Sequence, residues 1–263
     1  AEMGHKVVVL EQKEKLGEPV CCTGIISQEC VNSFAINEDV IFRRVNSAKI
    51  YSPSSKFLNL WRQEPQACIV DRAAFNTVQA IRAQNNGAEY ILSSPVKGIE
   101  VSKDKVTIQV SDQRGNNSLF VAKGVVIATG FGSKLVEGLG FGTVGDFAIG
   151  VQAEVAVTGI EEVEVYLGQE IAPAFFAWLV PTSPHRALVG LLSRRNPGLH
   201  LRKLMASLLD QGKIASAEVE RSYGGIPLKP LARSYSDRII VVGTAAGQVK
   251  PITGGGIYYG LIC

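Results

Sequence analysis

The 263-residue sequence contains no apolar run of membrane-spanning length, so no membrane-crossing helix is expected. The net charge is also small. The formal net charge is +3 and the charged residues are dispersed, which does not indicate a nucleic-acid partner. Internal repeats and low-complexity segments are absent. The composition, 46% hydrophobic and 19% charged, is that of a globular protein of one or two domains, soluble or at most peripheral to a membrane.

Cysteine is sparse, with an odd count of five at positions 21, 22, 30, 68 and 263. The spacing does not match a zinc site, so no metal site is expected, and free thiols favour a reducing cytoplasm. We predict that Cys30, Cys68 and Cys263 are buried structural thiols. The adjacent Cys21 and Cys22 need separate treatment.

Both ends of the sequence are typical of a cut within a longer protein. The opening "AEMGHKVVVL" resembles the end of a helix that turns at Gly4 into a strand, and "GGGIYYGLIC" stops about two turns into a new helix. We therefore expect the chain to be a fragment.

The first half mixes strands and helices. Residues 6–10 are a continuous apolar run, typical of a buried strand in a parallel sheet. A loop is expected around 17–27, and helices over 28–34 and 72–85. Antiparallel strands are predicted over 48–61 and 67–70. Short strands from 88 to 122, two of them joined by the turn "QRGN", predict a β-meander that leads into a buried strand at 124–128.

The second half alternates apolar and polar residues with period two from 147 to 223, and one amphipathic helix interrupts it at 199–209. This order predicts an α/β fold (α+β overall) in which a β-rich domain interrupts a Rossmann-like domain. We assign residues 1–46, 71–146 and 225–263 to the Rossmann-like domain, and 47–70 and 147–224 to the β-rich domain.

Two features point to a dinucleotide. Glu11 follows a strand, where a carboxylate accepts hydrogen bonds from an adenosine ribose; a solvated acid at a strand end is the alternative. Near the C-terminus, "RIIVVGTAAGQVKPITGGGIYYGL" places a buried strand, the loop at Gly243 and three glycines, Gly254 to Gly256, at a predicted helix start. Glycines there leave bare N–H groups for an anion or a reduced flavin ring, whereas a plain flexible loop is the alternative.

These motifs resemble the geranylgeranyl reductase family, within the group that shares the p-hydroxybenzoate hydroxylase fold. "VVGTAAGQVKPITGGGIYYGL" is similar to the family's second FAD motif, and "VVVLEQKEKLGEPVCCTGIIS" to its strand-plus-cysteine segment. "IVDRAAFN", "VVIATGFGS" and "FFAWLVP" are similar to three further motifs, in the family's order along nearly the whole chain.

The resemblance implies FAD as cofactor and a role for each matched residue. Glu11 binds the adenosine ribose, Arg72 the phosphates or ribityl chain, and Ala128, Thr129 and Gly130 approach the dinucleotide. Gly243, Thr244 and Gly254 to Gly256 surround the flavin. A second set forms the lipid pocket beside the flavin: Cys22, Phe176, Trp178 and Pro181.

Some positions depart from the family. Thr244 stands where the family usually has Asp, which removes a charge and predicts weaker flavin retention. Phe176 replaces a tyrosine, and Val180 replaces an aromatic residue. Both changes leave an apolar wall.

The implied reaction is saturation of carbon–carbon double bonds in geranylgeranyl chains, by hydride from reduced flavin and a proton for which Cys22 is the candidate donor. The wording of the glycine motif favours archaeal membrane glycerolipids and a cytoplasmic protein at the membrane face. Reduced nicotinamide, ferredoxin and a deazaflavin remain open as electron donor. A monooxygenase on the same fold and a non-catalytic flavin or lipid binder are the alternatives. The helix at 199–209 either lines the chain's tunnel or, as its spacing favours, covers the sheet.

Overall fold

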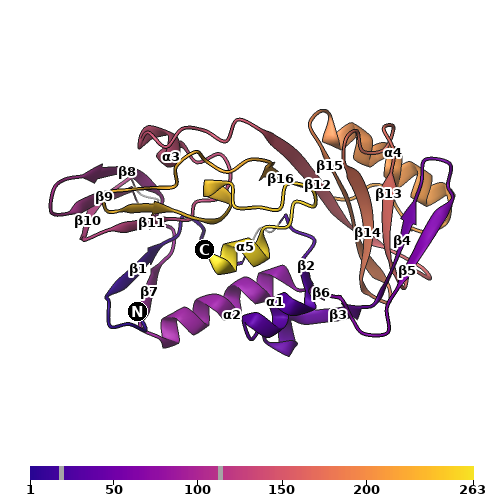
Figure 1. The fold of residues 1–263 in the computed structure, drawn as a ribbon, viewed down its shortest axis with the longest axis horizontal. Helices are drawn as coiled ribbons and strands as arrows, with labels where there is room; N and C mark the ends of the chain where they lie inside the picture. Colours follow the sequence, from indigo (N-terminus) through magenta and orange to yellow (C-terminus); the bar gives the residue numbers. More distant parts are fainter. Residues whose placement is uncertain (18–20, 112–114) are drawn as a thin grey trace.

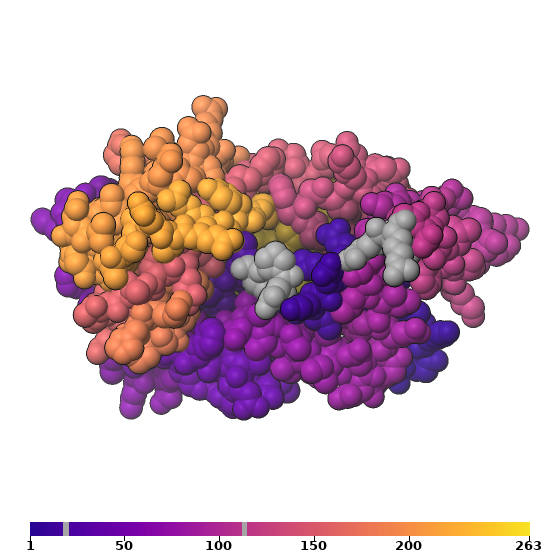
Figure 2. Space-filling view, turned by 180° about the vertical axis from the view of Figure 1, so that it is seen from behind, coloured from indigo at the N-terminus to yellow at the C-terminus, as the bar shows by residue number. Residues whose placement is uncertain are grey.

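The computed structural model describes residues 1–17, 21–111 and 115–263. The molecule is elongated, with a large sheet and helix α4 (Pro197–Asp210) at one end and most of the smaller sheets at the other (Figure 1). Seen from behind, the C-terminal segment lies between these two ends (Figure 2). No helix among the described residues is long and apolar enough to cross a membrane.

Strand β1 (Val7–Leu10) pairs in parallel with β7 (Ala88–Ile91), as the apolar run predicts. Gly4 turns the chain into β1 with a φ of 82°. The strand is half-buried, because a single neighbour strand and one cluster of apolar residues around Leu10 cover it.

Helix α2 (Arg72–Asn85) has the predicted bounds. The Asp71 carboxylate caps it by accepting a hydrogen bond from the Ala74 amide at 3.0 Å. Gly87, with a φ of 89°, follows its end. The helix buries Phe75 in a cluster with Ile26, Cys30 and other residues, onto which Ile257 and Tyr258 of the C-terminal helix also pack.

The predicted meander consists of β8 (Val96–Val101), β9 (Val106–Ser111) and β10 (Asn117–Ala122), paired antiparallel. Of the predicted "QRGN" turn, residues 113 and 114 lie outside the described residues. Next, β11 (Val125–Ile127) pairs in parallel with β18 (Ile239–Val241), whose other neighbour is β17 (Tyr235–Ser236). The expectation of fully buried strands is wrong here: Val126 is 63% exposed, because only one face of this sheet packs on the core.

The large sheet has seven strands in the order β16-β12-β15-β14-β13-β4-β5. Only β13 and β4 are parallel; the other neighbours are antiparallel, as period-two alternation predicts. The strands are β4 (Ser47–Tyr51), β5 (Phe57–Trp61), β12 (Phe147–Ala156), β13 (Val163–Leu167), β14 (Phe176–Ser183), β15 (Arg186–Ser193) and β16 (Ser222–Pro227).

Helix α4 covers one face of this sheet. Leu201, Leu204, Met205 and Leu208 are buried in one cluster with residues of the sheet that include Ala177 and Leu179 of β14. Alternation along β14 places Phe176 and Trp178 on the opposite face. The favoured expectation, that this helix covers the sheet, is therefore confirmed, and it does not line the side where Trp178 lies.

The fifth sheet, of three antiparallel strands, lies beside α2 (Figure 1). It contains β2 (Ile25–Ser27), β3 (Ile41–Val45) and β6 (Ala67–Val70). In the predicted loop around 17–27, residues 18–20 lie outside the described residues. Because β6 pairs with β2 and β3, residues 47–70 are shared between two sheets, and the division into two domains stays a prediction.

The remaining helical segments are short. The helix predicted at 28–34 is confirmed as α1, capped by the Ser27 hydroxyl. The short helical segments are α1 (Gln28–Ser33), η1 (Glu38–Val40), α3 (Lys134–Gly138), η2 (Gly243–Ala246) and α5 (Ile257–Ile262). Cys30 and Cys68 are buried as predicted. The prediction for Cys263 is wrong: it is exposed, because it follows the last residue of α5 and lies beyond that helix's packed face.

Candidate functional site

The segment that contains Cys21 and Cys22 is held on the large sheet by one glutamine. Gln152 of β12 donates from Nε2 to the Cys22 carbonyl at 3.3 Å, and its Oε1 accepts from the Thr23 hydroxyl at 2.9 Å. Gln152 is only 6% exposed, so these bonds satisfy a buried amide. The sequence reasoning missed Gln152, because one polar residue in an alternating strand gives no distinct signal.

Gly24 fixes where this segment goes next. It has a φ of 73°, and a Cβ there would lie 2.3 Å from the Val70 carbonyl oxygen, so only glycine fits. The Val70 amide donates to the Gly24 carbonyl at 2.9 Å. The cysteine segment is thus joined to the end of β6, immediately before α2 and Arg72.

Arg72 and Cys22, both predicted site residues, are brought together. The Arg72 guanidinium donates a hydrogen bond to Asn76 Oδ1, lies near the Cys22 side chain, and has its carbon 5.0 Å from the centre of the Phe75 ring. Burial lowers the pKa of Arg72, and the neighbouring Cys22 opposes this shift. Arginine nonetheless stays protonated, so a largely desolvated positive charge lies beside the Cys22 sulfur.

Cys21 has different surroundings. Burial raises the pKa of its thiol, a hydrogen bond with Ser222 partly offsets this, and the charge of Cys22 adds to it. Cys21 packs against Gly224 of β16, because a Cβ added at that glycine would lie 3.5 Å from the Cys21 sulfur. Cys21 therefore remains a neutral thiol at neutral pH, with a packing role.

The three glycines near the C-terminus form a loop that precedes the helix. The Gly254 amide donates to the Lys250 carbonyl at 2.8 Å, and the Lys250 amide donates to Gly255 at 3.1 Å. Gly254 has a φ of 69°, which a helix does not allow, so α5 begins at Ile257 with Gly256 as its N-cap. The expectation that all three glycines open the helix is thus corrected.

This glycine loop rests on the large sheet. A Cβ on Gly254 would lie 3.1 Å from Ile226 of β16 and 3.4 Å from Leu192 of β15. A Cβ on Gly256 would lie 3.8 Å from the Thr244 hydroxyl, so the two predicted segments around Thr244 and Gly256 are neighbours.

Two further predicted segments leave one edge of the β11–β18 pair. Ile127 is opposite Val241, and the Val242 amide donates to the Ile127 carbonyl at 2.9 Å, so Ala128 to Gly130 and Gly243 begin side by side. Gly130 and Gly243 have φ of 77° and 63°, and the space that a Cβ would occupy is open at both. Bare backbone therefore faces open space at the carboxyl edge of parallel strands, the usual ligand side of such sheets.

Phe176 and Trp178 lie together on the sheet face opposite α4, with ring centroids 5.9 Å apart. The Trp178 indole covers Gly190 of β15, where a Cβ would lie 2.5 Å from Trp178 Cζ2. Its buried Nε1 has no hydrogen-bond partner among the described residues. Pro181 is buried, but alternation and its pairing with Ala187 place it toward α4, apart from Phe176 and Trp178.

The strand register shows that Trp178 and Gln152, which holds the Cys22 segment, lie on the same face of the large sheet. Trp178 is opposite Gly190, Gly190 is opposite Gln152, and Gln152 is opposite Ser222. Trp178 is therefore two strand spacings, about 10 Å, from the glutamine that holds Cys22. The Gly254 loop contacts the neighbouring row through Leu192, which is opposite Gly150.

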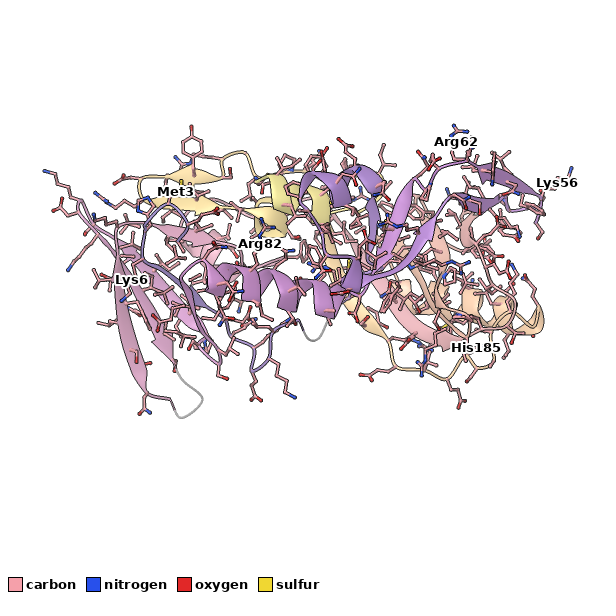
Figure 3. All side chains as sticks on the ribbon, turned by 90° about the horizontal axis from the view of Figure 1, so that it is seen from below. Met3, Lys6, Lys56, Arg62, Arg82 and His185 are labelled. Carbon is pink, nitrogen blue, oxygen red and sulfur yellow. The ribbon has the colours of Figure 1, made fainter. Side chains whose placement is uncertain are left out.

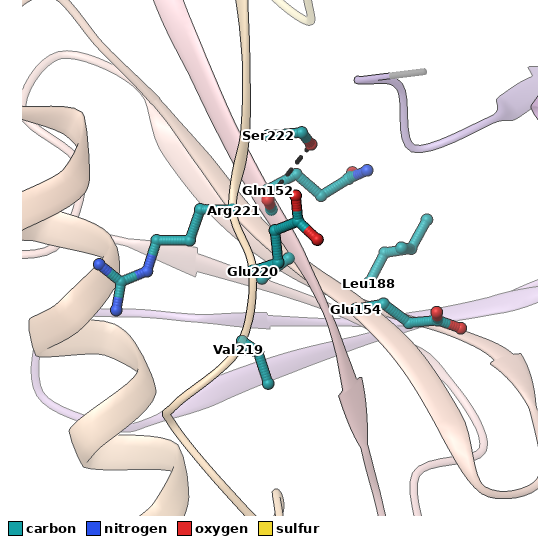
Figure 4. A pocket seen from close by; sticks show the side chains of 8 residues that line it. Gln152, Glu154, Leu188, Val219, Glu220, Arg221 and Ser222 are labelled. Atoms are coloured by element: carbon teal, nitrogen blue, oxygen red, sulfur yellow. Dashed lines mark hydrogen bonds between the residues drawn. The ribbon is translucent and has the colours of Figure 1, made fainter. Parts of the chain in front are cut away.

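A cavity of about 530 Å³ opens beside Gln152 (Figure 4). The Ser222 hydroxyl donates to the Gln152 carbonyl at 3.3 Å within this wall. The lining residues are Gln152, Ala153, Glu154, Leu188, Val219, Glu220, Arg221 and Ser222. No predicted site residue lines it, so it adjoins the cysteine segment only through Gln152 and Ser222.

Glu11 lies apart from this group, at the end of β1. Its amide donates to the Ile91 carbonyl at 3.0 Å, and its Oε1 accepts from the Lys13 amide at 3.0 Å. Burial raises the pKa of nearby Tyr90, and the Glu11 carboxylate adds to the shift. The structure thus groups Cys22, Arg72 and the glycine segments around the large sheet, whereas the role of Glu11 stays a prediction.

Comparison with known proteins gives consistent matches. The family described as FAD dependent oxidoreductase matches residues 36–260. A digeranylgeranylglycerophospholipid reductase of Methanothrix thermoacetophila is 30% identical, over 98% of this chain and 69% of that protein. A second, of Methanocaldococcus jannaschii, is 28% identical over 100% of this chain and 70% of that protein.

Comparison with solved structures agrees with these sequence matches. A geranylgeranyl bacteriochlorophyll reductase-like protein of Thermoplasma acidophilum superimposes with a TM-score of 0.88 at 25% identity, over 99% of this chain and 70% of that one. A myxobacterial FAD-dependent chondrochloren halogenase superimposes with a TM-score of 0.74 at 12% identity, over 98% of this chain and 66% of that one, and this likeness concerns the fold alone.

Proposed function

Since this chain belongs to the FAD dependent oxidoreductase family, we propose that it saturates the double bonds of geranylgeranyl chains in archaeal membrane glycerolipids. The relatives named digeranylgeranylglycerophospholipid reductase support this substrate class. The observation that carries the proposal is the bonding of the Cys22 segment to Gln152, on the sheet face that also presents Phe176 and Trp178.

The residues present fit FAD. Gly130 and Gly243 offer backbone to open space, and no backbone hydrogen bond among the described residues uses the amides of Gly255 or Gly256 as donors. Such free amides suit the flavin's N1 and C2 oxygen, where a reduced ring carries negative charge. Arg72 supplies a cation for the phosphates or the ribityl chain.

We assign the remaining cofactor contacts from the same loops. Ala128, Thr129 and Gly130 border the dinucleotide, Gly243 and Thr244 the ribityl chain, and Gly254 to Gly256 the ring. Glu11 binds the adenosine ribose from the end of β1. Thr244 provides one hydroxyl and no charge.

In the proposed reaction, reduced FAD, when bound, would be the source of the hydride that one alkene carbon accepts. The Cys22 Sγ–H donates its proton to the other carbon, so that one hydrogen molecule is added per double bond. The positive charge of the neighbouring Arg72 faces the sulfur that gives up this proton. Gln152 keeps this thiol in position through the Cys22 carbonyl.

Phe176 and Trp178 hold the chain and exclude water. An isolated alkene is a poor hydride acceptor, so the reaction depends on a dry, oriented complex. We assign these two side chains to the substrate pocket, and Pro181 supports β14 from the α4 face of the sheet. By this assignment residues 47–70 and 147–224 form the substrate domain, and residues 1–46, 71–146 and 225–263 form the FAD-binding domain.

Mass spectrometry of the lipid tests the proposal. The complete gene product, loaded with FAD and reduced without oxygen, is incubated with digeranylgeranyl lipid in detergent. Stepwise gain of one hydrogen molecule per double bond is expected. Unchanged lipid with FAD bound would overturn the reductase and favour a monooxygenase, and unchanged lipid without FAD would favour a non-catalytic binder. Supplying reduced nicotinamide, ferredoxin or deazaflavin in turn then identifies the donor.

A further inference from the structure

The β4–β5 hairpin carries large apolar side chains that the described part of the chain leaves largely exposed. On β5, Phe57, Leu58, Leu60 and Trp61 are 56%, 60%, 47% and 62% exposed. The strand is the edge of the large sheet, so one row of its backbone groups is also unpaired. Soluble proteins protect such edges, and an apolar patch of this kind indicates a binding surface.

Basic residues flank the apolar run of β5 on both sides. Lys56 precedes Phe57 and Arg62 follows Trp61, and both project from the end of the molecule that carries β4 and β5 (Figure 3). Alternation along β5 puts Leu58 and Leu60, with Lys56 and Arg62 beside them, on one face. Phe57 and Trp61, with Asn59 between them, are on the other face. Aromatic rings favour the headgroup level of a bilayer, and lysine and arginine reach past it to phosphates. Both faces of this edge strand therefore offer exposed apolar side chains close to basic residues, which suits an anionic lipid surface.

Pairing with a second copy of the chain is disfavoured by the same charges. An antiparallel pair of β5 strands centred on Asn59 would place Lys56 of one copy opposite Arg62 of the other. A parallel pair in register would place Lys56 beside Lys56. Like charges directly opposite each other destabilise a strand pair. A bilayer with negative headgroups meets no such penalty.

The hairpin is also connected to the candidate site by a row of side chains. Leu58 is opposite Ile50, Ile50 is opposite Val165, and Val165 is opposite Trp178. Directly opposed residues share a face, so these four apolar side chains cross four strands on the side away from α4. On this side Val165 and Trp178 also pack in one cluster with the buried Ile69 of β6. The row then continues through Gly190 to Gln152, which holds Cys22.

We propose that the β4–β5 hairpin docks on an anionic lipid bilayer and that a lipid chain reaches the site along the row from Leu58 to Trp178. The route of the chain rests on the proposed function, whereas the docking does not. Docking at this edge would let an isoprenoid tail leave the bilayer against apolar side chains without crossing water.

Cosedimentation with vesicles tests the docking. Vesicles of phosphatidylglycerol and of phosphatidylcholine are compared for the complete protein and two double variants, Leu60→Ser with Trp61→Ser and Lys56→Gln with Arg62→Gln. On phosphatidylglycerol the charge variant should bind about 30-fold more weakly, from roughly fivefold per basic residue. The apolar variant should lose binding on both vesicle types.

A matched control uses β10, where Leu119 and Val121 are 66% and 63% exposed. Leu119→Ser with Val121→Ser should bind vesicles as the unaltered protein does. Equal loss in this control, undiminished binding by both hairpin variants, or a hairpin-dependent dimer in analytical ultracentrifugation would overturn the docking surface. Urea unfolding midpoints confirm that each variant is folded.

Activity separates the docking from the reaction. The hairpin variants should reduce lipid in detergent as the unaltered protein does, and should be slower on lipid in phosphatidylglycerol vesicles. If the unaltered protein reduces lipid in detergent but does not bind vesicles, the docking fails and the reductase stands. If it binds vesicles through the hairpin and reduces no lipid in either form, the reductase and the route fail and the docking stands.

Discussion

At the scale of single residues, Cys22 and Arg72 make the most specific pair in the site. If Cys22 donates the proton, Cys22→Ala removes general acid catalysis and should lower kcat about 100-fold. Cys263→Ala, which changes an exposed thiol, is the matched control and should leave kcat unchanged. The rate of lipid reduction by the FAD-loaded protein measures both. Unaltered turnover in Cys22→Ala would assign the proton to another donor.

A second group of residues lies on the α4 face, far along the sheet from Cys22. Lys213 Nζ is 2.7 Å from Glu164 Oε2 and 3.0 Å from the Tyr166 hydroxyl, and Glu164 is only 5% exposed. Burial, reinforced by the Glu164 hydrogen bond, raises the pKa of Tyr166, so this phenol stays protonated. Removing one partner leaves a buried charge alone.

Lys213→Met should therefore lower the free energy of unfolding by about 3 kcal/mol in urea titration. Lys203→Met breaks an exposed ion pair with Glu170 and should change it by less than about 0.5 kcal/mol. Adding Glu164→Gln to Lys213→Met should restore part of the loss, since the unpaired charge is gone. No recovery in the double variant would contradict this explanation.

At the scale of elements, the contact between β14 and β15 depends on Gly190. An Ala there would place its Cβ 2.5 Å from the Trp178 ring of β14 and 2.7 Å from the Val151 carbonyl oxygen of β12, so the Trp178 side chain and the β12 backbone must shift. Gly190→Ala should lower the free energy of unfolding by about 2 kcal/mol. At Gly150 a Cβ meets only ordinary contacts of 3.5 Å, so Gly150→Ala should be neutral or stabilise by about 0.5 kcal/mol. Equal effects in urea unfolding would show that the Trp178 contact is not the cause.

The attachment of β4 to β13 should depend on pH. The Lys49 hydrogen bond lowers the pKa of Glu162 below its ordinary value of 4.5, with Ser47 contributing. A carboxyl with a lowered folded-state pKa stabilises the fold above the ordinary value, and the contribution is lost as pH falls through the folded value. Between pH 5 and acid unfolding, Glu162→Gln should therefore lose less stability than the unaltered protein. Parallel pH profiles of the two proteins would refute this.

The sequence predicts the longer elements well and their partners poorly. Helix α2 is found at its bounds because Asp71 and Gly87 mark its ends, and the strands of the large sheet are found by alternation. Strands β2, β3 and β17 are missed because so few residues give no measurable period. The sheet to which β6 belongs depends on contacts with residues distant in sequence, which local pattern does not contain.

The same limit applies to the site. The glycine and cysteine motifs are visible in the sequence because their residue types are unusual. Gln152 is not, because its role depends on a segment 130 positions away. The separation of Pro181 from Phe176 and Trp178 follows from simple alternation, which the motif resemblance overlooks.

At the scale of the whole molecule, three of the four stretches assigned to FAD are distant in sequence and meet beside the large sheet. They are those around Arg72, Ala128 to Gly130 and Gly243 to Gly256, whereas Glu11 lies apart. A ligand that binds only the folded arrangement stabilises it by mass action. FAD at 100 times its dissociation constant should add about 2.7 kcal/mol and raise Tm by several degrees in calorimetry. Gly254→Val, which strains a left-handed position against Ile226, should reduce this shift. An FAD-independent Tm would argue against the cofactor site.

The chain has only two tryptophans, and the fold separates them. Trp61 is on the exposed edge strand, and the Trp178 indole nitrogen is buried beside the candidate site. Each is therefore a native optical probe of a different event. A bilayer around Trp61 should shift its emission to the blue, whereas a flavin near Trp178 should quench by energy transfer. With Trp61→Phe and Trp178→Phe to assign the signals, one emission spectrum can report membrane contact and cofactor occupancy together, without a label.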